Sequence, residues 1–121
     1  MLKTAVIGVG YLGRFHAQKF ASLEESELIG VVDTNPEQGK KVSEELDVPF
    51  YLNFEEIINK VDAVSIAVPT VHHYKYAKAF LANGVHVLLE KPFAETIEEA
   101  EELAKLSSDN NVSLQLSLIH I

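Results

Sequence analysis

The hexapeptide GVGYLG at residues 8–13 decides the fold, because it follows the β-branched run TAVI at residues 4–7 and opens a stretch with helical apolar spacing. Its three glycines have separate tasks in that context. Gly8 permits a tight turn, Gly10 lets the backbone approach a pyrophosphate, and Gly13 lets a helix pack closely against a strand. The stretch therefore predicts a strand, a phosphate-binding loop and a helix, which form the first unit of a dinucleotide-binding fold.

The start of this helix and the end of the next strand complete the predicted cofactor site. A helix N-terminus offers unpaired N–H donors to phosphates, so we expect Tyr11 and Leu12 to contact the cofactor together with the glycines. Asp33 directly follows the run GVV at residues 30–32, about twenty residues after Gly13. A carboxylate there accepts hydrogen bonds from both hydroxyls of an adenosine ribose and repels a 2′-phosphate. With no arginine adjacent, the pattern favours NAD over NADP. S-adenosylmethionine is the main competing ligand, and Gly13 followed by Arg14 fits it less well.

Short β-branched runs alternate with longer amphipathic ones along the rest of the chain. This alternation is typical of an α/β fold with a parallel sheet covered on both faces. We expect a doubly wound Rossmann sheet of about six strands in the order 3-2-1-4-5-6. The expected strands lie near residues 3–8, 27–33, 49–52, 62–67, 85–89 and 112–117.

Helix boundaries and buried helix faces are also indicated. Helix starts are predicted at Asn35 before a proline, at Asn53 with Glu56, and at Thr96 with Glu99. Apolar stripes expected to face the sheet are Leu12, Phe15, Phe20 and Leu23; Tyr76, Ala77, Phe80 and Leu81; and Ile97, Ala100, Leu103, Ala104 and Leu106. Five glutamates between residues 95 and 102 fit an acidic first turn better than a cation site, because the helix dipole favours negative charge there.

Composition bounds the possible partners and location. The 121 residues suffice for one domain, and 47% hydrophobic with 23% charged residues is typical of a globular chain. A net charge of −8 argues against nucleic acid and anionic membranes as partners. The absence of cysteine excludes disulfides and thiolate sites, and the adjacent His72 and His73 lack a third ligand, so no metal site is predicted. Without a signal peptide or an apolar span, the sequence predicts a cytoplasmic protein.

Two further segments end predicted strands at the sheet edge where ligands bind in open α/β folds: AVPTVHH at residues 67–73 and LEKPF at residues 89–93. Together with the glycine loop and the run GVHVLLEKP at residues 84–92, they resemble the N-terminal domain of the Gfo/Idh/MocA family of NAD(P)-dependent oxidoreductases. The resemblance covers roughly residues 1–115. Thr70 stands where the family usually has asparagine.

The resemblance implies that Lys91 is the catalytic lysine, touching the nicotinamide ribose and the reacting hydroxyl of the substrate. It also implies that Glu90 and His73 lie close to the cofactor and that Pro69 and Thr70 contact it. A cation beside a secondary alcohol stabilises developing alkoxide charge as hydride leaves for the nicotinamide. Without the resemblance, Glu90 and Lys91 would be interpreted as a surface ion pair at a strand end. Such a pair contributes little to stability.

Substrate and assembly are likewise implied rather than derived. Residues 8–19 are most similar to bacterial members that act on nucleotide sugars, in particular UDP-N-acetylglucosamine 3-dehydrogenases. The resemblance therefore implies a dehydrogenase acting on the CH–OH group of a sugar or nucleotide sugar, and a homo-oligomer for the full-length protein. A free-standing module that senses NAD(H) without catalysis is the alternative function. An inactive protein with the same fold is a third reading.

The predicted domain organisation is a cofactor domain over residues 1–115, without the second domain that supplies the substrate pocket and oligomer interface in the family. We therefore expect no turnover from this chain alone. The final hexapeptide, LSLIHI at residues 116–121, is what the end of a transposon-based sequencing adapter encodes. We accordingly hypothesise that it is a non-native tail, the alternative being a natural apolar final strand.

Overall fold

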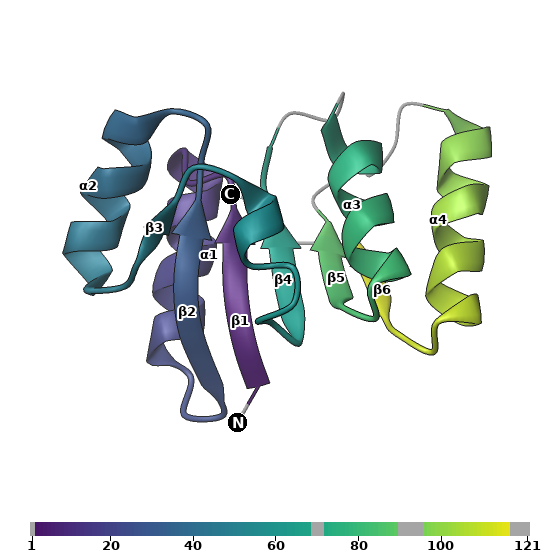
Figure 1. Ribbon diagram of the computed structural model, residues 1–121, viewed down its shortest axis with the longest axis horizontal. Coiled ribbons are helices and arrows are strands. Elements are labelled where there is room, and N and C mark those ends of the chain that lie inside the picture. Colours follow the sequence, from purple (N-terminus) through teal and green to yellow (C-terminus); the bar gives the residue numbers. More distant parts are fainter. Residues whose placement is uncertain (1, 69–71, 90–95, 117–121) are drawn as a thin grey trace.

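The computed structural model describes residues 2–68, 72–89 and 96–116, which form a six-stranded parallel sheet with helices on both faces. The strand order β3-β2-β1-β4-β5-β6 runs across Figure 1 and confirms the predicted doubly wound topology. The strands are β1 (Leu2–Ile7), β2 (Ser26–Val32), β3 (Phe50–Tyr51), β4 (Ala63–Ile66), β5 (His86–Leu89) and β6 (Leu114–Leu116). The predicted non-native tail begins at Leu116, and residues 117–121 lie outside the described residues.

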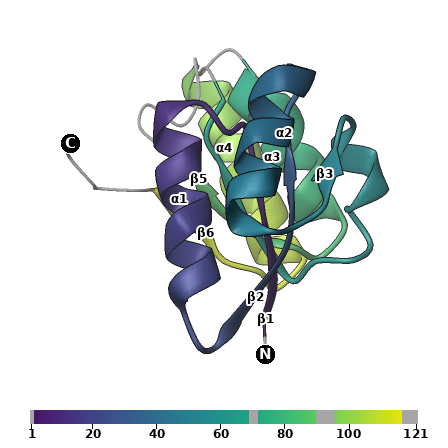
Figure 2. The same cartoon turned by 90° about the vertical axis from the view of Figure 1, so that its left-hand side faces the viewer.

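Strand β1 lies in the middle of the sheet, and its side chains enter two different cores. Ala5 and Ile7 pack in a core that includes buried residues of α3 (His73–Ala82) and α4 (Ile97–Asp109). Val6 packs in a second core with residues of α1 (Tyr11–Ser22) and α2 (Pro36–Leu46). Helices α1 and α2 therefore cover one face of the sheet, and α3 and α4 cover the other. Figure 2 views the sheet from its β3 end, with α1 on one side of β1 and β2.

The pairing of β1 with β2 contains one irregularity. Thr4 lies opposite Leu28, but the next residue, Ala5, lies opposite Gly30, so Ile29 is an extra residue in β2. Beyond this point the pairing is regular and ends with Ile7 opposite Val32. The two strands thus end level with each other, and Gly8 and Asp33 follow them side by side.

Two of the predicted helix starts are confirmed, and the third differs in type. The Asn35 side chain accepts hydrogen bonds from the N–H groups of Glu37 and Gln38 at 3.1 and 3.4 Å, at the start of α2. The Thr96 hydroxyl accepts one from the N–H of Glu99 at 3.1 Å, at the start of α4. Asn53 and Glu56 form the predicted capping box, with the N–H of Asn53 donating to Glu56 Oε2 at 3.4 Å, but the element that begins there is a single 3₁₀ turn, η1 (Phe54–Glu56). This turn ends where Ile57 enters the core.

Among the described side chains the apolar stripes are largely confirmed, but Leu23, Ile97 and Ala104 are exposed. Phe80 and Leu103 are fully buried, as expected of residues that face the sheet. Ile97 is 77% exposed because it is the first residue of α4, and Leu23 is 53% exposed because its backbone is already extended at the end of α1. Among the helices of the described ranges, none is long and apolar enough to cross a membrane.

Candidate functional site

The glycine loop connects β1 to α1 through a tight turn at Gly8, as the sequence predicts. Gly8 has a φ of +88°, and its N–H donates to the carbonyl of Val32 at 2.7 Å. A Cβ on Gly8 would lie 2.8 Å from a methyl carbon of Val68 and 2.9 Å from the carbonyl oxygen of Ala67. Both the conformation and the space therefore require glycine at this position.

The carboxylate of Asp33 joins the end of β2 to this loop. Its Oδ2 accepts a hydrogen bond from the N–H of Val9 at 2.9 Å, and its Oδ1 accepts one from the N–H of Asn35 at 2.8 Å. Each oxygen retains a second acceptor position, because a carboxylate offers about four in all. Asp33 is thus oriented by the protein and still able to accept hydroxyl donors from a ligand.

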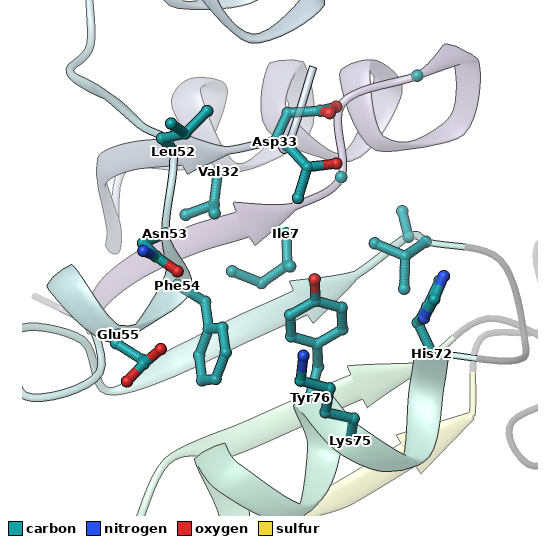
Figure 3. A pocket seen from close by; sticks show the side chains of 15 residues that line it. Ile7, Val32, Asp33, Leu52, Asn53, Phe54, Glu55, His72, Lys75 and Tyr76 are labelled. Atoms are coloured by element: carbon teal, nitrogen blue, oxygen red, sulfur yellow. The ribbon is translucent and has the colours of Figure 1, made fainter. Parts of the chain in front are cut away.

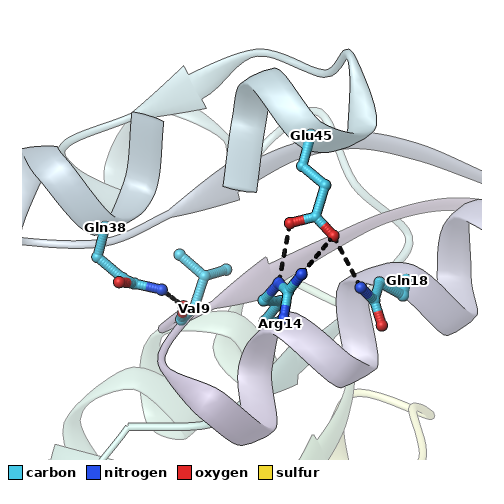
Figure 4. A network of polar contacts seen from close by, with 5 residues as sticks. All are labelled: Val9, Arg14, Gln18, Gln38 and Glu45. Atoms are coloured by element: carbon cyan, nitrogen blue, oxygen red, sulfur yellow. Dashed lines mark hydrogen bonds and ion pairs between the residues drawn. The ribbon is translucent and has the colours of Figure 1, made fainter. Parts of the chain in front are cut away.

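The side chain of Gln38, which follows Asp33 in the sequence, also contacts the glycine loop (Figure 4). The Nε2 of Gln38, in the first turns of α2, donates to the carbonyl of Val9 at 2.7 Å. Val9 itself is completely buried. The middle of the glycine loop is therefore held by side chains on both its N–H and its C=O.

An ion pair links α1 to α2 behind the loop. The Arg14 guanidinium contacts both carboxylate oxygens of Glu45, at 2.8 and 2.9 Å, and Gln18 donates to the same carboxylate at 2.8 Å. These hydrogen bonds from Arg14 and Gln18 hold the pKa of Glu45 below its ordinary value, and the hydrogen bond to Glu45 raises the pKa of Arg14. The pair fixes the helix that carries Gln38 relative to the helix that the loop opens.

A cavity of about 690 Å³ lies at the carboxyl edge of the sheet, in the size range of about 300–1,000 Å³ that is typical of ligand sites (Figure 3). Gly10 opens onto it, since a Cβ there would meet no atom within 4 Å. The lining comes from the ends of β1, β2, β3 and β4 and from the start of α3. The lining residues are Ile7, Gly8, Gly10, Val32, Asp33, Thr34, Leu52, Asn53, Phe54, Glu55, Ala67, Val68, His72, Lys75 and Tyr76.

One wall of the cavity is aromatic and was not predicted as part of the site. Phe54 and Tyr76 meet edge to face with ring centroids 5.1 Å apart, and His72 lies 6.5 Å from Tyr76. The Nζ of Lys75 lies 5.8 Å from the Tyr76 ring centre. The helical pattern assigned Tyr76 to the core, which it does contact, but a pattern cannot show that the same ring also reaches a cavity. The available signal was position, because these residues closely follow the ends of β3 and β4.

The histidines occupy different environments. His73 is 1% exposed, with its Nε2 2.8 Å from the carbonyl oxygen of Val68, whereas its neighbour His72 lines the cavity. His16 is buried on α1, with its Nδ1 against the hydroxyl of Ser65. Cofactor contact by His73 stays a prediction.

Several predicted site residues lie outside the described part of the chain. They are Pro69, Thr70, Glu90 and Lys91, and for Tyr11 and Leu12 only the backbone, at the start of α1, is described. The strands that precede them are placed, however. Ile66 pairs with Ile7 on one side and with Leu89 on the other. The strand ends that lead into the glycine loop, the 67–73 segment and the 89–93 segment are therefore neighbours.

Comparison with known proteins agrees with this arrangement. Residues 2–118 match the model of a family described as an oxidoreductase family with an NAD-binding Rossmann fold, Gfo/Idh/MocA. UDP-N-acetylglucosamine 3-dehydrogenase from Acidithiobacillus ferrooxidans is 42% identical over 98% of the chain, and its crystal form P212121 superposes with a TM-score of 0.92. The scyllo-inositol 2-dehydrogenase (NADP(+)) IolW of Bacillus subtilis is 29% identical over 95% of the chain.

A solved structure with cofactor is also similar. GenD2 from gentamicin A biosynthesis, in complex with NAD, has a TM-score of 0.93 and 27% identity over 96% of the chain. The chain spans 37% of the Acidithiobacillus relative, 32% of IolW and 34% of GenD2. The similarity thus concerns the part of each relative that corresponds to this sheet and its helices.

Proposed function

The chain belongs to the Gfo/Idh/MocA oxidoreductase family, of which it forms the NAD-binding Rossmann fold, and we propose that it is the cofactor half of an NAD-dependent sugar dehydrogenase. The observation that carries the proposal is the Asp33 carboxylate, which lies at the cavity and is bonded to the glycine loop. The 42% identity to a nucleotide-sugar dehydrogenase supports a nucleotide sugar as the substrate class. Substrate contacts and assembly into a homo-oligomer would involve the remainder of a longer protein.

The residues present fit a dinucleotide. Gly10 leaves open space at the N-terminus of α1, where backbone N–H groups favour the pyrophosphate. The free acceptor positions of Asp33 suit the two hydroxyls of the adenosine ribose. The aromatic wall of the cavity, formed by Phe54 and Tyr76, suits a flat aromatic base.

NAD rather than NADP is the proposed cofactor. A 2′-phosphate would bring two negative charges against the Asp33 carboxylate, and the neighbouring positions Thr34 and Asn35 carry no charge. The family includes a relative named for NADP, so the preference depends on this local chemistry rather than on membership.

Catalysis is proposed at the segment after β5. A bound nicotinamide cofactor would supply the acceptor for the hydride that leaves the carbon bearing the substrate hydroxyl. Lys91 would hold a positive charge next to that hydroxyl and stabilise the oxygen as its proton leaves, with Glu90 orienting the lysine. Pro69, Thr70 and His73 would contact the cofactor from the neighbouring segment after β4. Since Ile66 pairs with Ile7 and with Leu89, the strands that precede the two segments end at the same edge of the sheet as β1, which leads into the glycine loop.

Titration of the protein with NAD and NADP tests the proposal. We expect NAD to bind in the micromolar to millimolar range and NADP to bind at least about tenfold more weakly. Asp33→Ala should weaken NAD and abolish the preference. Asp62→Ala is the matched control, because the Asp62 carboxylate also accepts a backbone N–H, from Lys3 at 2.9 Å, but does not line the cavity. Absence of NAD binding, or an equal effect of the two substitutions, would contradict the proposal.

A further inference from the structure

Both backbone polar groups of Val9 are occupied by side chains that follow β2. Its N–H donates to Asp33 Oδ2 at 2.9 Å, and its C=O accepts from Gln38 Nε2 at 2.7 Å. Its own side chain is fully buried in the core between the sheet and helices α1 and α2. With all three groups held, Val9 has one orientation relative to α2 (Figure 4).

The orientation of Val9 determines that of the next amide. The peptide unit between Val9 and Gly10 is planar and trans, so its C=O and N–H point in opposite directions. Because the C=O points to Gln38 on α2, the N–H of Gly10 points away from α2. Gly10 lines the cavity and immediately precedes α1, where anions are favoured.

The hydrogen bonds around Gln38 form a closed circuit. The Asn35 side chain accepts from the N–H of Gln38, and the N–H of Asn35 donates to Asp33. Asp33 in turn binds Val9, which accepts the Gln38 amide. Gln38 therefore closes a ring that connects the ribose-facing carboxylate to the phosphate-facing loop.

We propose that Gln38 is a positioning residue for the cofactor diphosphate, acting through the Val9 carbonyl to aim the Gly10 amide. The inference rests on the proposed function, because it assumes a dinucleotide in the cavity. A glutamine suits this role because its amide donates a hydrogen bond without bringing a negative charge near the phosphates. Methionine has a similar length and no donor, so Gln38→Met would release the Val9–Gly10 peptide while keeping the side-chain volume.

The test compares ligands that differ in their phosphates. ADP carries the diphosphate, whereas adenosine has the same base and ribose without it. We expect Gln38→Met to weaken ADP and NAD by about tenfold and to change adenosine affinity by less than about twofold, since one hydrogen bond is lost at the loop alone. Gln18→Met is the matched control. Gln18 also makes an amide hydrogen bond between α1 and α2, to Glu45, and should leave all three affinities unchanged.

The outcomes separate this inference from the proposed function. Failure of the unaltered protein to bind NAD would overturn both. Normal NAD and ADP binding by Gln38→Met would overturn only the role of Gln38, as would an equal loss of ADP and adenosine, which indicates general disruption.

A measurement without any substitution covers the case in which the variant does not fold. In the amide NMR spectrum of the unaltered protein, the Gly10 signal should move when ADP is added and stay in place with adenosine. A Gly10 signal that is insensitive to ADP would also overturn the inference.

Discussion

The carbonyl oxygen of Gly8 lies where a Cβ of Gly13 would have to be: the two positions are only 1.7 Å apart. No side chain can share that space, so the first turn of α1 rests directly on the end of β1. A Cβ on Gly10, which lies between them in the sequence, would meet no atom within 4 Å. The three glycines of one motif therefore differ in what a methyl group would do to the protein.

Stability should separate two of these glycines. Gly13→Ala forces the helix away from the strand, and we expect it to lower the free energy of unfolding by about 3 kcal/mol or more. Gly10→Ala should change it by less than about 0.5 kcal/mol, because nothing is displaced. Urea denaturation of both variants measures the difference. Equal losses would show that the loop relaxes to admit either methyl group.

Cofactor affinity should reveal the role of Gly10. In Gly10→Ala the added methyl projects into open space at the N-terminus of α1, where we propose that the pyrophosphate binds. We expect about tenfold weaker NAD binding by calorimetry, with adenosine binding retained. If NAD binds Gly10→Ala as tightly as it binds the unaltered protein, the diphosphate does not approach this residue.

Truncation of two apolar residues of α4 should destabilise the protein to very different extents. Leu103 is fully buried, so Leu103→Ala should cost about 3 kcal/mol through lost burial and the cavity that remains. Ile97 is 77% exposed, and Ile97→Ala should cost less than about 0.5 kcal/mol. Denaturant midpoints of the two variants provide the comparison. A large loss for Ile97→Ala would mean that this residue is covered in the folded protein.

The Arg14–Glu45 pair should make stability depend on pH in the acid range. Hydrogen bonds from Arg14 and Gln18 lower the pKa of Glu45 in the folded state, so the pair stabilises the fold above the ordinary value of 4.5. The contribution is lost as the pH falls through the lowered folded-state pKa. We therefore expect the protein to have a higher melting temperature than Glu45→Gln at pH 7, and the gap to close as the pH falls below about 4.5.

Salt provides the control for that titration. Because both side chains are partly exposed, at 45% and 30%, high ionic strength should also reduce the gap at pH 7. A melting-temperature difference that is independent of both pH and salt would assign the effect of Glu45→Gln to packing instead of charge.

The order of the strands could be predicted from the sequence because local signals determine it. Alternating strands and helices impose parallel pairing, and right-handed crossovers leave few arrangements. The glycine spacing places the first crossover, and caps such as Asn35 mark helix starts through contacts only two or three residues apart. These signals need no knowledge of the rest of the molecule.

The parts that were missed depend on distant neighbours. The contact between Gln38 and Val9 joins residues 29 positions apart, and no pattern in α2 distinguishes Gln38 from any other polar helix residue. Ile97 has the correct spacing for a buried residue, but its exposure depends on where the helix begins relative to the sheet. Phe54 and Tyr76 come together only when β3 and β4 take their places in the sheet.

The extra residue in β2 decides which way Asp33 faces. Side chains alternate along a strand, so inserting one residue reverses the parity of everything after it. If Ala5 paired with Ile29, Gly8 would lie level with Val32, and the acid would come one step later and on the opposite face of the sheet. Removing Ile29 would therefore exchange the inward and outward residues in one half of the strand. The direction in which the Asp33 carboxylate faces is therefore determined at Ile29, four residues before the carboxylate itself.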